Sequence, residues 1–113
     1  MINNQIFPNS QDFYISLHFH LIYAFMSKID FKIRGIKAKY EDSNSTKVIC
    51  YFDGEVTEED REEIAEVEDE IIAAFCSPYN AINIYFETIR LDSPNPLPQN
   101  NSSEWFYRRK EPL

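Results

Sequence analysis

Residues 57 to 76 carry an apolar side chain at every third or fourth position, and acidic side chains fill most of the positions between them. This spacing follows the helical period of about 3.6 residues and predicts a helix that buries one stripe and exposes the opposite side. Thr57 and Asp60 form a variant capping box at its start, and Pro78 prevents its continuation. The apolar stripe consists of Ile64, Val67, Ile71, Ala74 and Phe75.

The negative charge of the chain is concentrated on this predicted helix. The 113 residues contain 11 Lys and Arg and 19 Asp and Glu, a net charge of −8. Residues 55 to 70 hold ten acids and one base, a net −9, so the remaining ten bases and nine acids sum to +1. Like charges four residues apart on a helix cost about 0.2–0.5 kcal/mol per pair. Either the acidic face only keeps the chain soluble, or it is a binding face for a positively charged partner.

Glycine content and charge argue against two classes of phosphate-binding protein. The only two glycines, Gly35 and Gly54, are too far apart to build a dinucleotide-binding loop or a P-loop. An excess of acids also argues against a general nucleic-acid binder, because such proteins neutralise phosphates with Lys and Arg. We therefore expect no direct contact with nucleic acid.

The N-terminal segment fits two periods at once. Apolar side chains occupy every second position of residues 13 to 25, as in a strand, yet Phe13, Leu17, Leu21 and Phe25 also fit one side of a helix. The run is much longer than an ordinary strand of about five or six residues. We predict a helix over about 11–29, with a strand as the alternative.

Strand patterns occupy residues 31–41, 46–52, 81–91 and 104–110, and the first two form a hairpin. The order α-β-β-α-β-β predicts one α+β domain over residues 1–113, with the helices packed on a mainly antiparallel four-stranded sheet. A proline-rich connector of residues 92–103 precedes the last strand, which could pair beside the third.

A helical wheel separates the acidic residues by direction. Glu68 falls near the edge of the apolar stripe, where we expect it to pair inward with a base of the sheet such as Arg34 or Arg90. The other acids point outward or precede the helix and are the candidate partner-binding residues. Those opposite the stripe are Glu59, Glu62, Glu66 and Asp69, and those at the rim are Glu63, Asp53 and Glu55.

Motifs for catalysis or metal binding are lacking. His18 and His20 would share a side only in a strand, and the serines have no nucleophile-elbow context. Cys50 and Cys76 lie in apolar runs, where a free cysteine behaves as a small buried hydrophobe; a disulfide or metal site is the alternative. We predict no enzyme activity, no cofactor and no metal.

The aromatic and basic residues near the C-terminus admit two interpretations. Three aromatic residues are followed directly by three bases, a pattern that a nucleic-acid binder could use. They are Trp105, Phe106, Tyr107, Arg108, Arg109 and Lys110. In a chain of net negative charge, we expect these bases to pair with acids of the chain itself or to end an edge strand.

Targeting patterns indicate a cytoplasmic protein. The N-terminal residues lack the basic and apolar regions of a signal peptide. No segment reaches the roughly 18 apolar residues of a membrane span, because His18 and His20 interrupt the best candidate. We predict a cytoplasmic location and no membrane contact.

Several short motifs resemble those of small bacterial immunity proteins, which are encoded beside contact-dependent growth inhibition and related polymorphic toxins (CdiI/MafI-like). The similarity covers residues 33 to 111 and includes the order of the elements, whereas residues 1 to 29 match poorly. The motifs are YFDGE at 51–55, EED at 58–60, EDEII at 68–72, ETIRLD at 87–92 and YRRKE at 107–111.

The resemblance implies a cytoplasmic antidote that binds the C-terminal toxin domain of its own system and blocks its active site. Such toxins are commonly nucleases, and an EndoU-like RNase or another tRNase is the family-level expectation. The acidic helix would then occupy a basic cleft. Two other classes of function remain: an acidic DNA mimic that regulates a DNA-binding protein, and an enzyme that uses clustered carboxylates with Mg²⁺.

Overall fold

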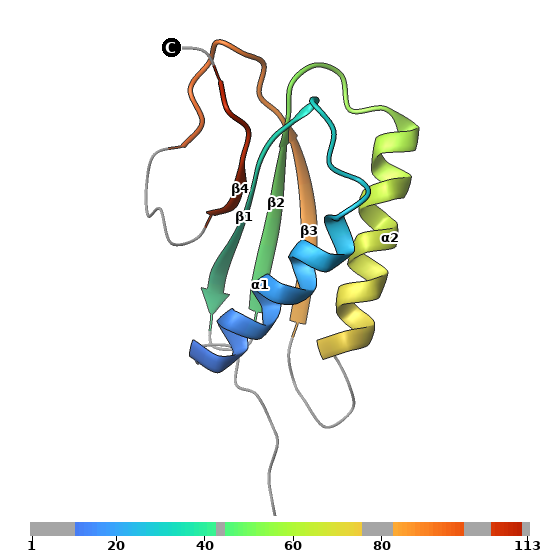
Figure 1. Ribbon diagram of the computed structural model, residues 1–113, viewed down its shortest axis with the longest axis vertical. Coiled ribbons are helices and arrows are strands. Elements are labelled where there is room, and N and C mark those ends of the chain that lie inside the picture. Colours follow the sequence, from blue (N-terminus) through green and yellow to red (C-terminus); the bar gives the residue numbers. More distant parts are fainter. Residues whose placement is uncertain (1–10, 43–44, 76–82, 99–104, 112–113) are drawn as a thin grey trace, which may run out of the picture.

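The chain forms two helices and four strands in the predicted order (Figure 1). The computed structural model describes residues 11–42, 45–75, 83–98 and 105–111. The N-terminal segment is a helix, as predicted, but it ends at residue 25 and gives way to a turn over residues 26–28. The elements are α1 (Gln11–Phe25), β1 (Ile33–Asp42), β2 (Ser45–Phe52), α2 (Glu58–Phe75), β3 (Asn83–Arg90) and β4 (Trp105–Arg108).

The four strands form one mixed sheet in the order β3-β2-β1-β4. β1 and β2 form the predicted antiparallel hairpin, in which Ile36 lies opposite Cys50, and β4 also runs antiparallel to β1. β3 runs parallel to β2. This is possible because α2 is a crossover connection that returns the chain to the end of the sheet where β2 begins. The expectation of a mainly antiparallel sheet is confirmed.

The position of β4 differs from the sequence-based suggestion. β4 pairs with β1, at the edge opposite β3, so the suggestion that the last strand lies beside the third is wrong. The connector after β3 instead crosses one face of the sheet, where Leu97 is buried against Ile49 and Tyr51. Burial of this leucine carries the chain across the sheet to the far edge. Residues 99–104 of the predicted connector lie outside the described residues.

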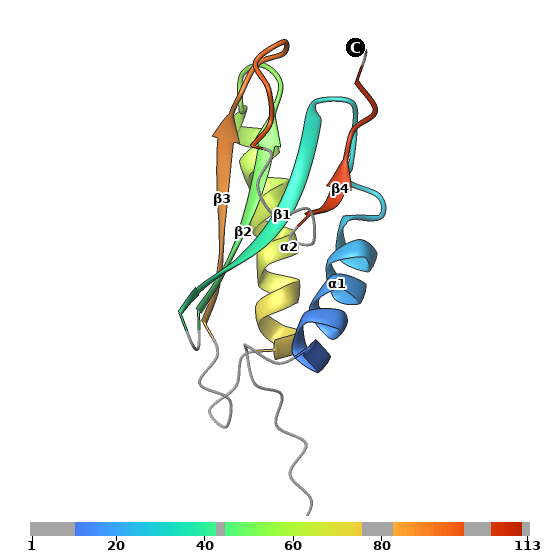
Figure 2. The ribbon, with the colours of Figure 1, turned by 90° about the vertical axis from the view of Figure 1, so that its left-hand side faces the viewer.

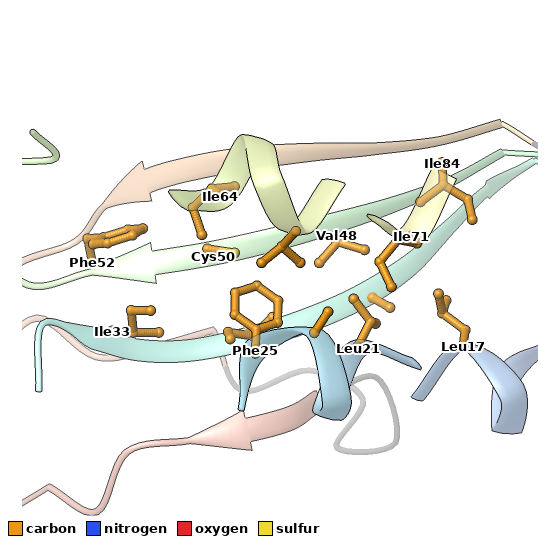
Figure 3. Close-up of a cluster of buried hydrophobic side chains, with 14 of the residues drawn as sticks. Leu17, Leu21, Phe25, Ile33, Val48, Cys50, Phe52, Ile64, Ile71 and Ile84 are labelled. Atoms are coloured by element: carbon orange, nitrogen blue, oxygen red, sulfur yellow. The ribbon is translucent and has the colours of Figure 1, made fainter. Parts of the chain in front are cut away.

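Both helices cover the other face of the sheet (Figures 1 and 2). Their apolar stripes meet side chains of β1, β2 and β3 in one core, drawn in Figure 3. The predicted stripe of α2 is confirmed except for Ala74, which lies at its margin and is exposed. The buried helix residues include Leu17, Leu21 and Phe25 of α1 and Ile64, Val67, Ile71 and Phe75 of α2.

Cys50 belongs to this core as a free buried thiol, as predicted. Burial raises the pKa of the Cys50 thiol to about 12, so the thiol is protonated and unreactive at neutral pH. Cys76 lies outside the described residues.

Close packing between β1 and β4 depends on Gly35. A Cβ atom at this position would lie 2.6 Å from Cζ3 of Trp105 and 3.4 Å from the carbonyl oxygen of Tyr107. The indole ring therefore occupies the space that a side chain at Gly35 would need. Lys37 and Arg108 flank the same ring, with their cationic groups 5.4 Å and 5.2 Å from its centroid.

We expect Gly35→Ala to displace the Trp105 ring and to lower the free energy of unfolding by about 1–3 kcal/mol, as overpacking does. Trp105 is the only tryptophan, so its fluorescence emission reports the displacement directly. Gly54→Ala is the matched control: Gly54 has a φ of +93° and no atom near its Cβ position. This control should lower stability through backbone strain and leave the emission maximum unchanged; an unchanged maximum for Gly35→Ala would contradict the packing argument.

Candidate partner-binding site

The predicted capping box starts α2 and joins it to the loop before β1. The hydroxyl of Thr57 accepts a hydrogen bond from the Asp60 N–H at 3.1 Å. Oδ2 of Asp60 accepts one from the Thr57 N–H at 2.9 Å and one from the ammonium of Lys32 at 2.6 Å. The start of the acidic helix is therefore held against the rest of the fold by charge-assisted hydrogen bonds.

The outward side of α2 carries the predicted acidic face. Glu59, Glu62 and Asp69 are exposed, and within the described ranges they form no ion pair. Glu66 forms a salt bridge of 3.1 Å with Lys28, but its side chain remains 65% exposed. Glu63 lies half-buried at the flank. The structure therefore places these five residues on one helix, with most of their charge available to a partner. We call Glu59, Glu62, Glu66 and Asp69 the acidic face.

The two acids predicted before the helix have different surroundings. Glu55 is exposed, as a residue at the rim of the acidic face should be. Asp53 is half-buried, and its carboxylate accepts hydrogen bonds from the guanidinium of Arg109 at 3.1 Å and from the Ser93 N–H at 3.2 Å. Asp53 therefore joins the end of β2 to the C-terminal segment.

Arg109 belongs to an ion cluster that fastens the end of the chain. The guanidinium of Arg34, 1% exposed, donates to both carboxylate oxygens of Glu111, at 2.6 Å and 2.8 Å, and to the carbonyl of Leu91 at 2.6 Å. Arg109 donates to Glu111 at 3.0 Å and to the carbonyl of Phe31. The pKa of the Glu111 carboxyl is lowered to about 2, first by hydrogen bonding and charge attraction to Arg34 and to a smaller extent by Arg109. Desolvation by burial acts in the opposite direction but is outweighed. We call Arg34, Arg109, Glu111 and Asp53 the C-terminal clamp.

The expectation for the basic cluster is confirmed at Arg109, which pairs with acids of its own chain. Arg108 lies over the Trp105 ring, as described above. Lys110 is exposed. Because one of these three bases is tied into the clamp and another covers an indole ring, the cluster resembles the end of an edge strand more than a nucleic-acid site.

Glu68 points inward, but its partner is not a base. Its carboxylate accepts a hydrogen bond of 3.0 Å from the backbone N–H of Phe86 on β3. The expected pairing with Arg34 or Arg90 is wrong, because Arg34 is bound to Glu111 and Arg90 to Asp92. β3 is an edge strand, so the N–H of Phe86 on its free side has no neighbouring strand to bond to, and the Glu68 carboxylate accepts its hydrogen bond instead.

Sequence reasoning missed an exposed apolar surface on α1. Tyr23, Phe19 and Met26 are 76%, 70% and 70% exposed, and two isoleucines beside them are about half exposed. The signal was the alternation of apolar residues: in a helix, every second residue is rotated by about 200°, so alternation places apolar side chains on two opposite sides. We call the exposed set the α1 outer stripe; it consists of Ile15, Phe19, Ile22 and Tyr23 of α1 and of Met26, the first residue after the helix.

The two histidines of α1 contact different neighbours. The His18 ring lies 5.8 Å from that of Phe106, and the His20 ring lies 4.9 Å from that of Phe75. Partial burial lowers the pKa of His18. Across the described part of the chain, no three His, Cys, Asp or Glu residues are arranged to hold a metal ion. None of the described helices is long and apolar enough to cross a membrane.

Comparison with known proteins gives one clear match. The family model described as "MafI2 immunity protein" matches residues 14–111, which is most of the chain. The search of curated proteins finds no match.

The C-terminal clamp predicts a pH dependence of stability. The pKa of Glu111 is about 2 in the folded chain and about 4.3 in an unfolded chain. Its stabilising contribution is therefore complete above about pH 4.5 and is lost as the pH falls toward 2. Glu111→Gln should lower the free energy of unfolding by about 2–4 kcal/mol at pH 7, because it leaves the buried Arg34 without its counter-charge.

Urea denaturation of the wild type and of Glu111→Gln at several pH values measures this effect. The difference between the two proteins should shrink as the pH falls from 4.5 to 2. Glu62→Gln, at an exposed position, is the control and should change stability by no more than about 0.5 kcal/mol. A difference that persists unchanged to pH 2 would contradict the assignment of the clamp.

Proposed function

Because this chain belongs to the MafI2 immunity protein family, which implies that it neutralises a cognate Maf toxin, we propose that it does so by covering the basic active-site cleft of a toxin nuclease domain. One molecule of the immunity protein binds one toxin domain in the cytoplasm, and no covalent bond is made or broken. Members of such families are generally non-enzymatic, so inhibition depends on affinity alone.

The observation that carries this proposal is the acidic face of α2. Glu59, Glu62 and Asp69 project outward from one rigid helix without ion-pair partners in the described ranges, and Glu66 is largely exposed. Repulsion between these side chains costs stability in the free protein. A cationic partner relieves that repulsion, which makes the face more favourable in a complex than alone.

Nuclease chemistry explains why acids would suit such a partner. A nuclease must attract and hold a phosphate backbone, so its substrate cleft is lined with Lys and Arg. A row of carboxylates on a helix presents negative charge to the same groups and competes with the substrate. Complementary charge also speeds encounter, which matters for an antidote that must reach the toxin before the toxin reaches RNA or DNA. An EndoU-like RNase is one toxin of this kind.

Glu62→Lys should slow association with the cognate toxin domain by about tenfold at low salt, because it reverses a charge at the centre of the acidic face. The difference from wild type should diminish as ionic strength rises, since salt screens exposed charges. Stopped-flow association rates from about 20 mM to about 500 mM NaCl measure both effects, because the Debye length shortens several-fold over this range.

Glu87→Lys is the matched control. Glu87 is an exposed acid on β3, and it shares with Tyr85 and Ile89 the side of the sheet that faces away from α2. The substitution changes the net charge equally and should leave the association rate within about twofold of wild type. Equal slowing by both variants would mean that total charge, rather than the acidic face, steers binding. Unchanged rates for Glu62→Lys would overturn the proposed use of α2.

A further inference from the structure

α1 has two apolar sides. Its inner stripe, with Leu17, Leu21 and Phe25, is fully buried in the core. At about 100° per residue, the α1 outer stripe lies almost diametrically opposite that inner stripe. A helix at the surface of a monomer needs one apolar side, so the second one has no role in the fold. Figure 2 places α1 at the margin of the molecule, with its outer side turned away from the sheet.

The α1 outer stripe is large enough to form the centre of a protein interface, although not the whole of one. Its five side chains expose on the order of 600 Å², since one aromatic side chain alone offers about 150–250 Å². That is at the upper end of the largest apolar patch on typical monomers, about 300–600 Å². A standard interface buries about 800 Å² per partner, so the stripe could form the centre of one.

The stripe borders the helix that carries the acidic face. A groove of about 330 Å³ between α1 and α2 is lined by Phe19, His20 and Tyr23 on one side and by Glu70 and Ile71 on the other. A groove of this volume has room for a large side chain. A second hollow of about 180 Å³ lies on the other side of Phe19, between Ile15, His18 and Ile22.

Charge selects among the molecules that could cover this surface. A second copy of the chain would bring another α2, with Glu66 and Glu70, toward the first, and juxtaposed like charges disfavour that arrangement. Anionic lipid attracts Lys and Arg beside an apolar stripe, but α1 contains neither. A protein surface that combines an apolar protrusion with surrounding basic residues complements both the stripe and its acidic border.

We propose that the α1 outer stripe is the apolar anchor of the toxin interface, and that a toxin side chain enters the groove between α1 and α2. This inference rests on the proposed function and enlarges its footprint from α2 alone to both helices. Protein interfaces usually have aromatic and methionine side chains at the centre and charged residues at the edge. The anchor determines how long the complex lasts, whereas the acidic face determines how fast it forms.

Phe19→Ala and Tyr23→Ala test the proposal against Phe31→Ala. Phe31 is 80% exposed but lines neither the groove nor the hollow, so it is a matched aromatic control. Binding of each variant to the purified cognate toxin domain is followed by biolayer interferometry at low and high salt. We expect both stripe variants to dissociate at least about thirtyfold faster, with an unchanged dependence of association on salt, and the control to stay within about twofold of wild type.

Two further measurements distinguish a loss of binding from unfolding of the variant and from dimerisation of the free protein. Thermal unfolding of each variant should match that of wild type within a few degrees, because the replaced side chains are exposed. Light scattering after size-exclusion chromatography should give a monomer for the free wild type.

Unchanged dissociation of the stripe variants, alongside slower association of Glu62→Lys, would overturn the anchor and leave the proposed function standing. A free wild-type dimer that Phe19→Ala converts to a monomer would assign the stripe to a second copy and overturn the anchor too. Failure of the wild type to bind the toxin domain at all would overturn the proposed function, and the anchor with it.

Discussion

Burial of both helices against one face of the sheet is the interaction on which the rest of this structure depends. The inner side of α1 and the apolar stripe of α2 share one core with β1, β2 and β3. Once these stripes are buried, the opposite side of each helix must face outward, and those two outer sides differ sharply. α2 presents carboxylates and α1 presents aromatic and aliphatic side chains. The same packing therefore leaves two adjacent surfaces of different chemistry, one acidic and one apolar.

Ion pairs between the elements hold the frame together. Lys28 and Lys32, between α1 and β1, pair with Glu66 and Asp60 of α2 and so connect the two helices on their exposed flank. At the far edge of the sheet, Arg34 holds Glu111 and thereby keeps β4 beside β1. A rigid frame of this kind allows a binding surface to be formed before the partner arrives, which reduces the entropy lost on association.

Much of the fold could be predicted because its signals are local. The capping box at Thr57, the period of the α2 stripe and the hairpin each involve residues close together in the chain. The outward position of the acidic face follows from the same period, and the structure shows its four residues exposed on α2; their role in binding stays a prediction. Predictions failed where the partner is distant in sequence. Glu68 accepts a hydrogen bond from a backbone N–H on β3, and β4 pairs with β1 at the edge of the sheet opposite β3.

Local patterns were enough to predict the elements, their order and the concentration of negative charge on one helix, because helical period and charge are properties of neighbouring residues. Which of the two apolar sides of α1 is buried depends instead on packing against the sheet. Alternation along α1 makes both sides apolar, and nothing local distinguishes them. The sheet buries the side with Leu17, Leu21 and Phe25, and it thereby leaves Phe19 and Tyr23 exposed beside the acidic helix.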